Sequence, residues 1–364
     1  MDVIDLTKTL VSIPSILGNT SQIEEFVLSR LEKVGSSQVE LVPVGNLGNN
    51  VLASVIHDEK LPTIMINGHL DTVDICKGWT RDPFKSFQDG DRLYGLGSAD
   101  MKSGVALGML AFEKLAKSSK ANVIYAGSID EEGDSAGAFA LLERGIKADL
   151  CLIPEPSGGS LMMGCRGRVV FDVSVRGASA HGSRPEQGVN AITEAGRFAC
   201  ALERLPLMTD DKLGKGSFCP LEISGGTRTL SVPDSCRLKI DRHHVRGEDQ
   251  TQMLQQLKEM VTVLNSHATF DITYLASRPT PFLEPYLTAN EGLAKIFTDA
   301  VGGKFTYGKS VGDYNAFSKR IPTVVYGPHG ENWHAPDEWV SIRSILECQT
   351  GYERFMSSLQ STPG

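Results

Sequence analysis

The sequence predicts an α/β fold in which a domain with a central, mostly parallel sheet is interrupted by an inserted ferredoxin-like α+β domain. Three observations predict it. Strand-like and helix-like segments alternate over residues 62–155, as in a parallel sheet with crossover helices. From about residue 166 the order becomes strand, helix, strand, strand, helix, strand, which is the ferredoxin-like order. The 364 residues are also too many for one simple core, so two domains are expected.

The first part of the sheet domain consists of short apolar runs separated by segments with helical spacing of apolar residues. Gly145 follows the second of these helical segments and is suited to end it. The expected elements are a strand at 62–66 (PTIMI), a helix at 102–117, a strand at 122–127 (NVIYAG), a helix at 136–145 and a strand at 149–153 (DLCLI).

The inserted domain and the return to the sheet domain follow from the same patterns. We expect the sheet domain to cover 1–164 and 278–364, and the inserted domain to cover 165–277. The expected elements of the insertion are strands at 168–175, 219–224, 235–241 and 269–275 and helices at 188–204 and 248–265. After it come a helix at 289–300, a strand at 323–327 and a helix at 341–359.

Composition excludes several classes of protein. The net charge of -8 is mild and argues against a nucleic-acid partner. No apolar run approaches the length needed to span a membrane. The N-terminus MDVIDLTKTL lacks the basic and apolar regions of a signal peptide. The seven cysteines form no C-x-x-C pair and indicate a reducing compartment, so we expect a cytoplasmic protein.

The stretch GHLDTVD directly follows the first strand and its next residue, Asn67. His69 and Asp71 are two residues apart and would point the same way from an extended chain. This arrangement suits a metal-binding imidazole whose other ring nitrogen is held by a carboxylate. An isolated H-x-D is common, however, and by itself is equally typical of a polar loop end.

Other acidic and imidazole side chains occupy comparable places. Taken singly, each could be a solvated loop residue, a turn residue or a structural histidine. Ligand clefts in open α/β sheets form at the carboxyl ends of strands, and all of these residues are predicted to lie at or just beyond such ends. Together they predict one site. They are Asp100 in LGSADMKSG, Glu131 and Glu132 in SIDEEGD, Glu155 in IPEPS and His334 in NWHAPDEW.

Two histidines and three carboxylates can hold two divalent ions if one carboxylate bridges them. The three carboxylates of this hypothesis are Asp100, Glu132 and Glu155. Of two adjacent glutamates, one can bind metal while the other stays free as a general base. Such a donor set suits zinc and would also accommodate cobalt or manganese.

Seven segments resemble, in order, the signatures of one metallopeptidase family: that of acetylornithine deacetylase, succinyl-diaminopimelate desuccinylase, aminoacylase and glutamate carboxypeptidase. The resemblance covers essentially the whole chain. It implies a di-zinc catalytic domain with an inserted lid domain that commonly forms a homodimer. The segments are GHLDTV, GLGSADMKSG, SIDEEGDSAG, PEPS, GASAHGSRPEQGVNAI, GGTRTLSVPDSCRLKIDRH and YGPHGENWHAPDEW.

The resemblance also implies a role for each site residue. His69 would bind one zinc ion, oriented by Asp71, and His334 would bind the other. Asp100 would bridge the two ions, and the peptide bond after it is often cis in relatives. Glu132 and Glu155 would each complete one metal site, and Glu131 would be the general base.

The inserted domain contains two further candidates. His181 resembles the histidine that stabilises the developing oxyanion, reaching the partner subunit's site in dimeric relatives; on its own it could be a polar loop residue. Arg242 matches an arginine that binds the substrate carboxylate, or it is a surface arginine at a strand end. Ser231 stands where relatives often have asparagine. His243 and His244 could be exposed lid residues or could extend an anion-binding pocket.

The expected activity is metal-assisted hydrolysis of the amide bond of an N-acyl amino acid, meaning an acetyl or succinyl derivative of ornithine, lysine or diaminopimelate. A carboxypeptidase or dipeptidase acting on short peptides is the alternative within the same chemistry. A non-catalytic binding subunit is a third possibility, although every ligand position and the base carry competent residues. A nucleotide-binding protein would need a glycine-rich phosphate loop after the first strand, where GHLDTVD has carboxylates instead.

Overall fold

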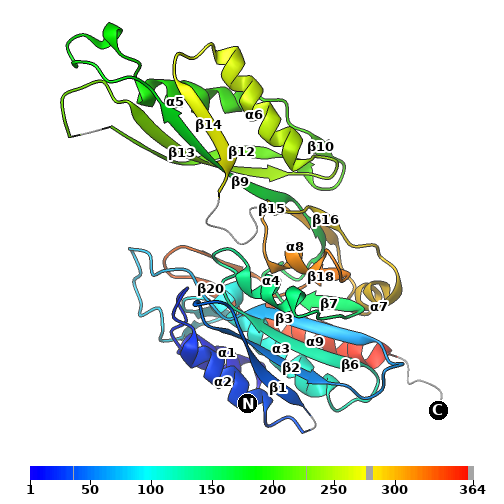
Figure 1. Cartoon of the computed structure of the whole chain (residues 1–364). Helices are drawn as coiled ribbons and strands as arrows, with labels where there is room; N and C mark the ends of the chain where they lie inside the picture. Colours follow the sequence, from blue (N-terminus) through cyan, green and yellow to red (C-terminus); the bar gives the residue numbers. More distant parts are fainter. Residues whose placement is uncertain (36, 227, 276–281, 360–364) are drawn as a thin grey trace. The chain divides into compact units, whose positions relative to one another are not determined.

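The computed structural model describes residues 1–35, 37–226, 228–275 and 282–359 (Figure 1). The chain divides into two compact units. Unit 1 comprises Met1–Gly164, Leu287–Tyr307 and Gly312–Gly364, and unit 2 comprises Cys165–Tyr286 and Gly308–Val311. The boundary expected at 277/278 lies outside the described residues.

A nine-stranded sheet forms the centre of unit 1. Its strands run in the order β1-β2-β6-β3-β7-β18-β8-β16, and β17 pairs with β8. The strands are β1 (Gln38–Pro43), β2 (Asn49–Val55), β3 (Thr63–His69), β6 (Asn122–Ser128), β7 (Leu150–Ile153), β8 (Leu161–Cys165), β16 (Tyr286–Leu287), β17 (Phe305–Gly308) and β18 (Thr323–Val325).

The centre of this sheet is parallel. β3 lies between β6 and β7 and is parallel to both, and β18 is parallel to β7. β1 and β2 add antiparallel strands at one side. These four central strands contain the runs that the sequence identifies as buried, which confirms the predicted α/β domain with a mostly parallel sheet.

Helices cover both faces of the sheet. α3 contacts α1 and α9, and α9, drawn in red in Figure 1, also contacts α7. α4 contacts α8, and α2 contacts β1 and β2. The helices of unit 1 are α1 (Val3–Val11), α2 (Ser21–Leu31), α3 (Ser103–Leu115), α4 (Ala136–Glu143), α7 (Gly292–Val301), α8 (Asp313–Phe317) and α9 (Ile342–Ser358).

The alternation of side chains along β3 shows which helix covers which face. A Cβ added at Gly108 of α3 would lie 3.0 Å from Ile66 of β3, so α3 covers the face to which Ile66 points. His69 points to the other face and is level with Ser128 of β6. Ser128 donates a 2.6 Å hydrogen bond to Asp313 of α8. The sheet is therefore sandwiched between α3 and α8.

A small antiparallel sheet carries one further loop of the site. Its strands run in the order β19-β20-β5-β4. The loop 332–338, which contains His334, connects β19 to β20. The strands are β4 (Phe87–Asp89), β5 (Arg92–Tyr94), β19 (Gly330–Glu331) and β20 (Trp339–Ser341).

Unit 2 has the predicted ferredoxin-like order. Its sheet runs β12-β13-β9-β14, with every neighbouring pair antiparallel, and buried residues of β9 and β13 share one core with α5 and α6. These elements are β9 (Gly167–Arg176), α5 (Ala191–Ala201), β12 (Ser217–Gly225), β13 (Ser235–His244), α6 (Gln250–Leu264) and β14 (Thr269–Tyr274). The shorter elements are β10 (Thr209–Asp210), β11 (Gly214–Lys215), β15 (Phe282–Leu283) and the 3-10 turns η2 (Pro185–Gln187) and η3 (Leu202–Arg204).

Local signals account for several element ends. Asn190 caps α5 by accepting hydrogen bonds from the N–H groups of Ile192 and Thr193. The helix predicted to end at residue 204 is α5 followed by the 3-10 turn η3. Gly145 follows α4 with a left-handed φ of 86°, which is the conformation that ends a helix at glycine.

Candidate metal centre

Three adjacent parallel strands bring four of the predicted site residues together. His69 is the last residue of β3, Glu131 and Glu132 follow β6, and Glu155 follows β7. Because β3 lies between the other two strands, their carboxyl ends meet at one edge of the sheet. His69 and Glu155 are buried. The structure therefore places these four predicted residues side by side.

Asp100 stands between the two histidines. Its Oδ1 lies 3.1 Å from Nε2 of His69, and its Oδ2 lies 3.6 Å from Nε2 of His334. Each oxygen of this one carboxylate thus faces a different imidazole. This is the arrangement that a bridging carboxylate requires.

A second carboxylate accompanies each histidine. Glu155 Oε1 lies 3.4 Å from Nε2 of His69, and Glu132 Oε2 lies 3.0 Å from Nε2 of His334. Five predicted side chains hence form two donor sets that share Asp100. His69 and Glu155 belong to one set, and His334 and Glu132 belong to the other.

The spacing of these donors fits divalent metal ions. Donor atoms about 2.0–2.2 Å from one tetrahedral zinc ion lie roughly 3.3–3.6 Å from each other, close to the four distances above. The Nδ1 atom of His69 lies 2.9 Å from the carbonyl oxygen of Asp71. Since a carbonyl only accepts, Nδ1 carries a proton and Nε2 faces the carboxylates. Nε2 of His69 and the carboxylate oxygens then face each other with lone pairs, so a proton or a metal ion is needed between them.

The electrostatics of the cluster also favour cations. Burial and the repulsion of neighbouring carboxylates raise the pKa of both Glu131 and Glu155 well above the usual value. Hydrogen bonds to Asp100 and Glu132 raise the pKa of His334 to about 10. Burial lowers the pKa of His69, but the charge of Glu155 and the hydrogen bond to Asp100, with the charges of Glu131 and Asp71, outweigh burial and leave that pKa well above the usual value. The site concentrates negative charge that divalent ions would neutralise.

Glu131 also lies beside the two donor sets. Its Oε2 is 4.0 Å from Nε2 of His69. Candidate ligand atoms of His69, Glu131 and Glu155 lie within 4.8 Å of one another, and so do those of His69, Asp100 and Glu132. Distance alone does not separate Glu131 from the ligands, so its role as the base stays a prediction.

The carboxylate of Asp71 does not make the shortest contact to His69. It was predicted to hold His69, but its Oδ1 lies 3.8 Å from Nδ1 of that residue, and the backbone carbonyl makes the contact instead. The carboxylate accepts hydrogen bonds from the N–H groups of Glu131 and Glu132, at 3.4 and 3.2 Å. Asp71 orients His69 through its main chain and positions the two glutamates through its side chain.

One buried carboxylate that the sequence analysis did not single out organises the loop of Asp100. Glu338 is 2% exposed and accepts hydrogen bonds from the N–H groups of Gly97, Ala99 and Asp100, at 2.7, 2.9 and 3.0 Å. The loop contains the short segment η1 (Ser98–Lys102), whose backbone is non-helical at Asp100 and Met101, and the peptide bond between these two residues is cis, as the resemblance implied. Glu338 follows His334 by four residues, so it links the loops of two ligands. In the sequence, Glu338 could have been identified from its place in the motif HAPDEW, which also contains His334.

Gly312 is a second residue near the site that was not predicted from the sequence. A Cβ added there would lie 2.5 Å from Oε1 of Glu131, so any larger residue would force that carboxylate to move. No pattern around this glycine distinguishes it from the other 36 in the chain.

His181 and Arg242, the two candidates of the inserted domain, belong to unit 2. His181 is exposed, its Nδ1 lies 2.8 Å from Oγ of Ser183, and its backbone pairs with that of Ser231. The role of His181 stays a prediction.

Arg242 is fully buried. It has the same parity along β13 as Leu238 and Ile240, whose side chains lie in the helix-covered core. Its guanidinium group pairs with Glu248 and donates to the carbonyl of Ser217. The alternative of a surface arginine is therefore wrong, and binding of a substrate carboxylate would require this group to leave Glu248.

The two histidines that follow Arg242 differ in their surroundings. Nε2 of His243 lies 3.1 Å from Asp241, whereas His244 is fully buried and stacks on Phe282 with ring centroids 4.8 Å apart. The interpretation of His244 as an exposed lid residue is therefore wrong.

Among the described residues, no helix is long and apolar enough to cross a membrane.

Comparison with protein families identifies the family to which the chain is similar. The model of peptidase family M20/M25/M40 matches residues 65–358. Among curated proteins, the chain is 28% identical to acetylornithine deacetylase of Edwardsiella ictaluri, over 95% of each chain. It is 27% identical to a putative succinyl-diaminopimelate desuccinylase of Mycobacterium tuberculosis, over 98% of each chain, and 28% identical to the uncharacterised protein YgeY of Escherichia coli, over 96% of this chain and 93% of the relative.

Solved structures share the fold at lower identity. An M20 family metallo-carboxypeptidase of Sulfolobus solfataricus superposes with a TM-score of 0.79 at 16% identity, over 99% of each chain. A tripeptidase of Staphylococcus aureus gives 0.78 at 20% identity, over 97% of this chain and 96% of that one. The YXEP protein of Bacillus subtilis, described as a dinuclear metal binding peptidase, gives 0.70 at 17% identity, over 99% and 98%.

Proposed function

The chain belongs to peptidase family M20/M25/M40, and from this premise we propose that it is a metal-dependent hydrolase that removes the acyl group from N-acyl amino acids. The observation that carries the proposal is the shared carboxylate: each oxygen of Asp100 faces a different imidazole. The curated relatives named acetylornithine deacetylase and succinyl-diaminopimelate desuccinylase support the choice of substrate class.

Two divalent ions, zinc or alternatively cobalt or manganese, would be held by the two donor sets. His69, Asp100 and Glu155 would hold one, and Asp100, Glu132 and His334 the other. When bound, such ions acidify a water molecule and polarise the amide carbonyl.

The chain itself would move the proton. The carboxylate of Glu131 would accept a proton from the attacking water and then donate it to the nitrogen of the leaving amine. Asp71 supports this step because it accepts a hydrogen bond from the N–H group of Glu131 and so holds the base at the edge of the sheet. His181 would donate a hydrogen bond to the developing oxyanion.

We also propose a homodimer formed through unit 2. The edge strand β12 is exposed from residue 219 to residue 225, and Leu221 and Ile223 on it are about half exposed, at 49% and 52%. An unpaired edge with apolar side chains is suited to pair with another chain. Sedimentation of the wild-type chain and of Ile223→Lys tests this: a dimer that the charge converts to a monomer is expected, and a monomeric wild type would reject it.

A second activity has specific support. The superposed tripeptidase and metallo-carboxypeptidase make hydrolysis of short peptides the alternative, by the same chemistry at the same residues. A non-catalytic binding subunit is disfavoured because each donor position and the base carry a competent side chain.

One experiment separates these possibilities. The purified chain is stripped of metal, reloaded with zinc, cobalt or manganese, and assayed against N-acetyl amino acids, N-succinyl amino acids and dipeptides. We expect about two ions per chain and metal-restored release of the acyl group. Hydrolysis of the peptides alone would establish the peptidase alternative. Absence of tight metal binding would contradict the proposal itself.

A further inference from the structure

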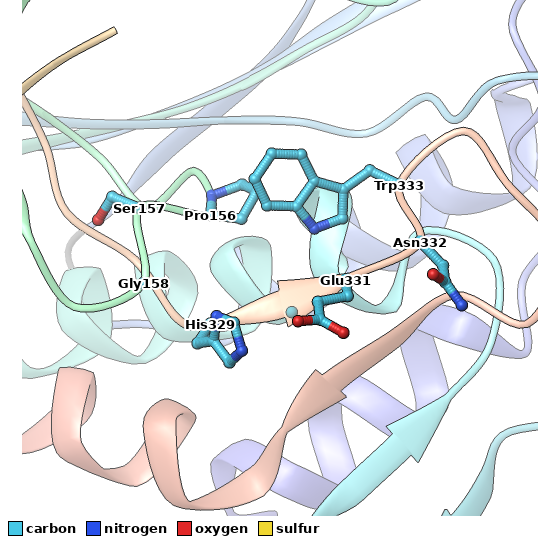
Figure 2. A pocket seen from close by; sticks show the side chains of 8 residues that line it. Pro156, Ser157, Gly158, His329, Glu331, Asn332 and Trp333 are labelled. Atoms are coloured by element: carbon cyan, nitrogen blue, oxygen red, sulfur yellow. The ribbon is translucent and has the colours of Figure 1, made fainter.

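The loop that carries Asp100 borders an open pocket of unit 1. The pocket has a volume of about 550 Å³ and is formed by the segment that follows β7 and the segment that includes β19 (Figure 2). Gly330 lines this pocket, and a Cβ added at Gly330 would overlap the side chain of Ala99, the residue before Asp100. Because a pocket wall gives the loop little support at Ala99, its position depends on contacts elsewhere.

Lys102, two residues after Asp100, is fully buried. Lysine side chains almost never lie fully in the interior unless they are paired. Nζ of Lys102 donates a hydrogen bond of 2.7 Å to the backbone carbonyl of Ile13, and among the described residues no carboxylate oxygen lies within 4.0 Å of this nitrogen. Burial of an amino group on a neutral acceptor is unfavourable for folding. Stability alone therefore does not explain the position of this side chain.

The carbonyl of Ile13 belongs to the loop after α1, and this loop is bound to the chain beyond β3. The N–H group of Thr72 donates to the carbonyl of Ser15, and the N–H group of Leu17 donates to the carbonyl of Thr72, both at 2.9 Å. Thr72 directly follows Asp71, which contacts three residues of the site. The hydrogen bond of Lys102 therefore links the loop of Asp100 to the segment after β3.

The same segments are also packed directly against each other. Gly97, in the loop of Asp100, has a left-handed φ of 74°. A Cβ added at Gly97 would lie 2.6 Å from Cγ2 of Thr72 and 3.3 Å from Cδ of Lys102. Both side chains thus lie against Gly97, so a shift of the Lys102 side chain would be felt by its own loop and by Thr72.

We infer that Lys102 is a positioning residue of the metal centre, which fixes the loop of Asp100 relative to the end of β3 through the loop after α1. The distance that this link would set is the 3.1 Å between Oδ1 of Asp100 and Nε2 of His69. The inference rests on the proposed function, because it concerns the residues that would hold the ions. Lys102 itself would contact neither an ion nor the substrate, since its Nζ is bound to Ile13.

Lys102→Met tests this link because methionine keeps an unbranched buried side chain but cannot donate to Ile13. We expect the affinity for zinc, measured by competition with a chelator, to fall about tenfold, the lower end of the range for residues that orient ligands. The urea midpoint of the metal-free variant should stay close to that of wild type, because loss of one hydrogen bond is offset by removal of a buried amino group. Lys114→Met, at an exposed position of α3, is the control and should leave the zinc affinity unchanged.

Two results of this experiment would overturn the inference. One is a zinc affinity that is the same in Lys102→Met and in wild type. The other is a urea midpoint that falls together with the affinity, since a general loss of stability would then account for the weaker binding. Lys102→Leu, a second apolar replacement, should repeat the expected result, with weaker zinc binding at an unchanged midpoint.

Hydrogen exchange separates this inference from the proposed function, because it needs neither metal nor substrate. In the metal-free chain, Lys102→Met should exchange about fivefold faster than wild type in peptides covering 12–19 and 95–103, the effect of about one hydrogen bond. Lys114→Met should not change these rates. Faster exchange in both segments would support the link even if the chain neither bound metal nor hydrolysed an amide. A wild-type rate in either segment would overturn the link even if zinc binding and hydrolysis were found.

Discussion

Two glutamates that are neighbours in sequence have different partners in the site. Glu132 reaches His334 at 3.0 Å, whereas Glu131 lies against Gly312 and 4.0 Å from His69. Their backbone N–H groups share the carboxylate of Asp71. The carboxylate of Asp71 thus holds the backbone of both glutamates, while their side chains reach different partners in the cluster.

Replacing Glu131 by glutamine tests its role as the base. Glutamine keeps the shape but cannot take up a proton, so we expect kcat to fall by about 10²–10⁴-fold with metal content unchanged. Glu132→Gln is the matched control and should lose one ion as well as activity. Kinetics and metal analysis of both variants check this, and a Glu131→Gln chain that loses metal would show that Glu131 is a ligand.

Gly312 offers a second test at the residue scale. A methyl group at this position would lie 2.5 Å from Glu131 Oε1, which is too close, so Gly312→Ala must displace that carboxylate. A misplacement of about 1 Å can cost roughly a hundredfold in rate, and metal content should not change. Gly196→Ala is the control, because a Cβ there meets nothing within 4 Å. Equal activity of the two variants would contradict the expected crowding.

At the scale of elements, Glu338 joins β20 to the loop of Asp100. Its Oε2 accepts from Gly97 and its Oε1 from Ala99 and Asp100, so both oxygens must be acceptors. Glutamine has one acceptor oxygen and would turn its amide N–H₂ toward at least one N–H donor.

We therefore expect Glu338→Gln to weaken metal binding by about 10–100-fold, the usual effect of losing a partner that orients ligands. Competition with a chelator measures the affinity. The neighbouring Asp337 accepts hydrogen bonds from Thr80 instead, so Asp337→Asn is the control and should retain wild-type affinity. Identical affinities of the two variants would exclude a positioning role for Glu338.

The end of β13 predicts a pH dependence of stability. Burial lowers the pKa of His244 to about 3, while in the unfolded chain it should be about 6.5. Because the unfolded state then binds more protons, the free energy of unfolding decreases as the pH falls below about 6.5. The contribution of His244 is complete above that pH and is lost progressively toward pH 3.

At pH 5 this group should have lowered the free energy of unfolding by about 2 kcal/mol. His244→Leu should remove this contribution from the difference in the free energy of unfolding between pH 7.5 and pH 5. The control is His267→Gln, at an exposed position, which should retain the wild-type difference. Urea denaturation of the metal-free chains measures both. A slope unchanged in His244→Leu would show that His244 does not carry the effect.

At the scale of the whole molecule, metal ions should stabilise the folded chain. The donor sets draw on β3, β6, β7, η1 and the 332–338 loop, segments far apart in sequence, and the unfolded chain has no such arrangement. Free ion at 1,000 times the dissociation constant adds about 4 kcal/mol.

Chelation should therefore lower the Tm by roughly 10 °C, as followed by calorimetry. Asp100→Asn, which weakens the shared ligand, should reduce this shift, and Glu131→Gln should keep it. A Tm that does not respond to chelator in the wild type would argue against metal bound across these segments.

Much of this architecture could be predicted from the sequence because its signals are local. Apolar runs of strand length at 62–66, 122–127 and 149–153 predict buried parallel strands, and residues after such strands must meet at one edge of the sheet. For this reason His69, Glu132 and Glu155 could be identified before the fold was known. The strand, helix, strand, strand, helix, strand order of unit 2 is readable in the same way.

The sequence by itself thus determined the family, the α/β sheet, the ferredoxin-like insertion and the residue types of the site, because these depend on periodicity and on motifs contiguous in the chain. Only the tertiary structure decided which group of Asp71 holds His69, that Gly312 abuts Glu131 and that Glu338 holds the loop of Asp100. It also placed Arg242 in the interior of unit 2. These features are contacts between atoms whose direction depends on backbone conformation and strand register, and neither is encoded in the spacing of residues along the chain.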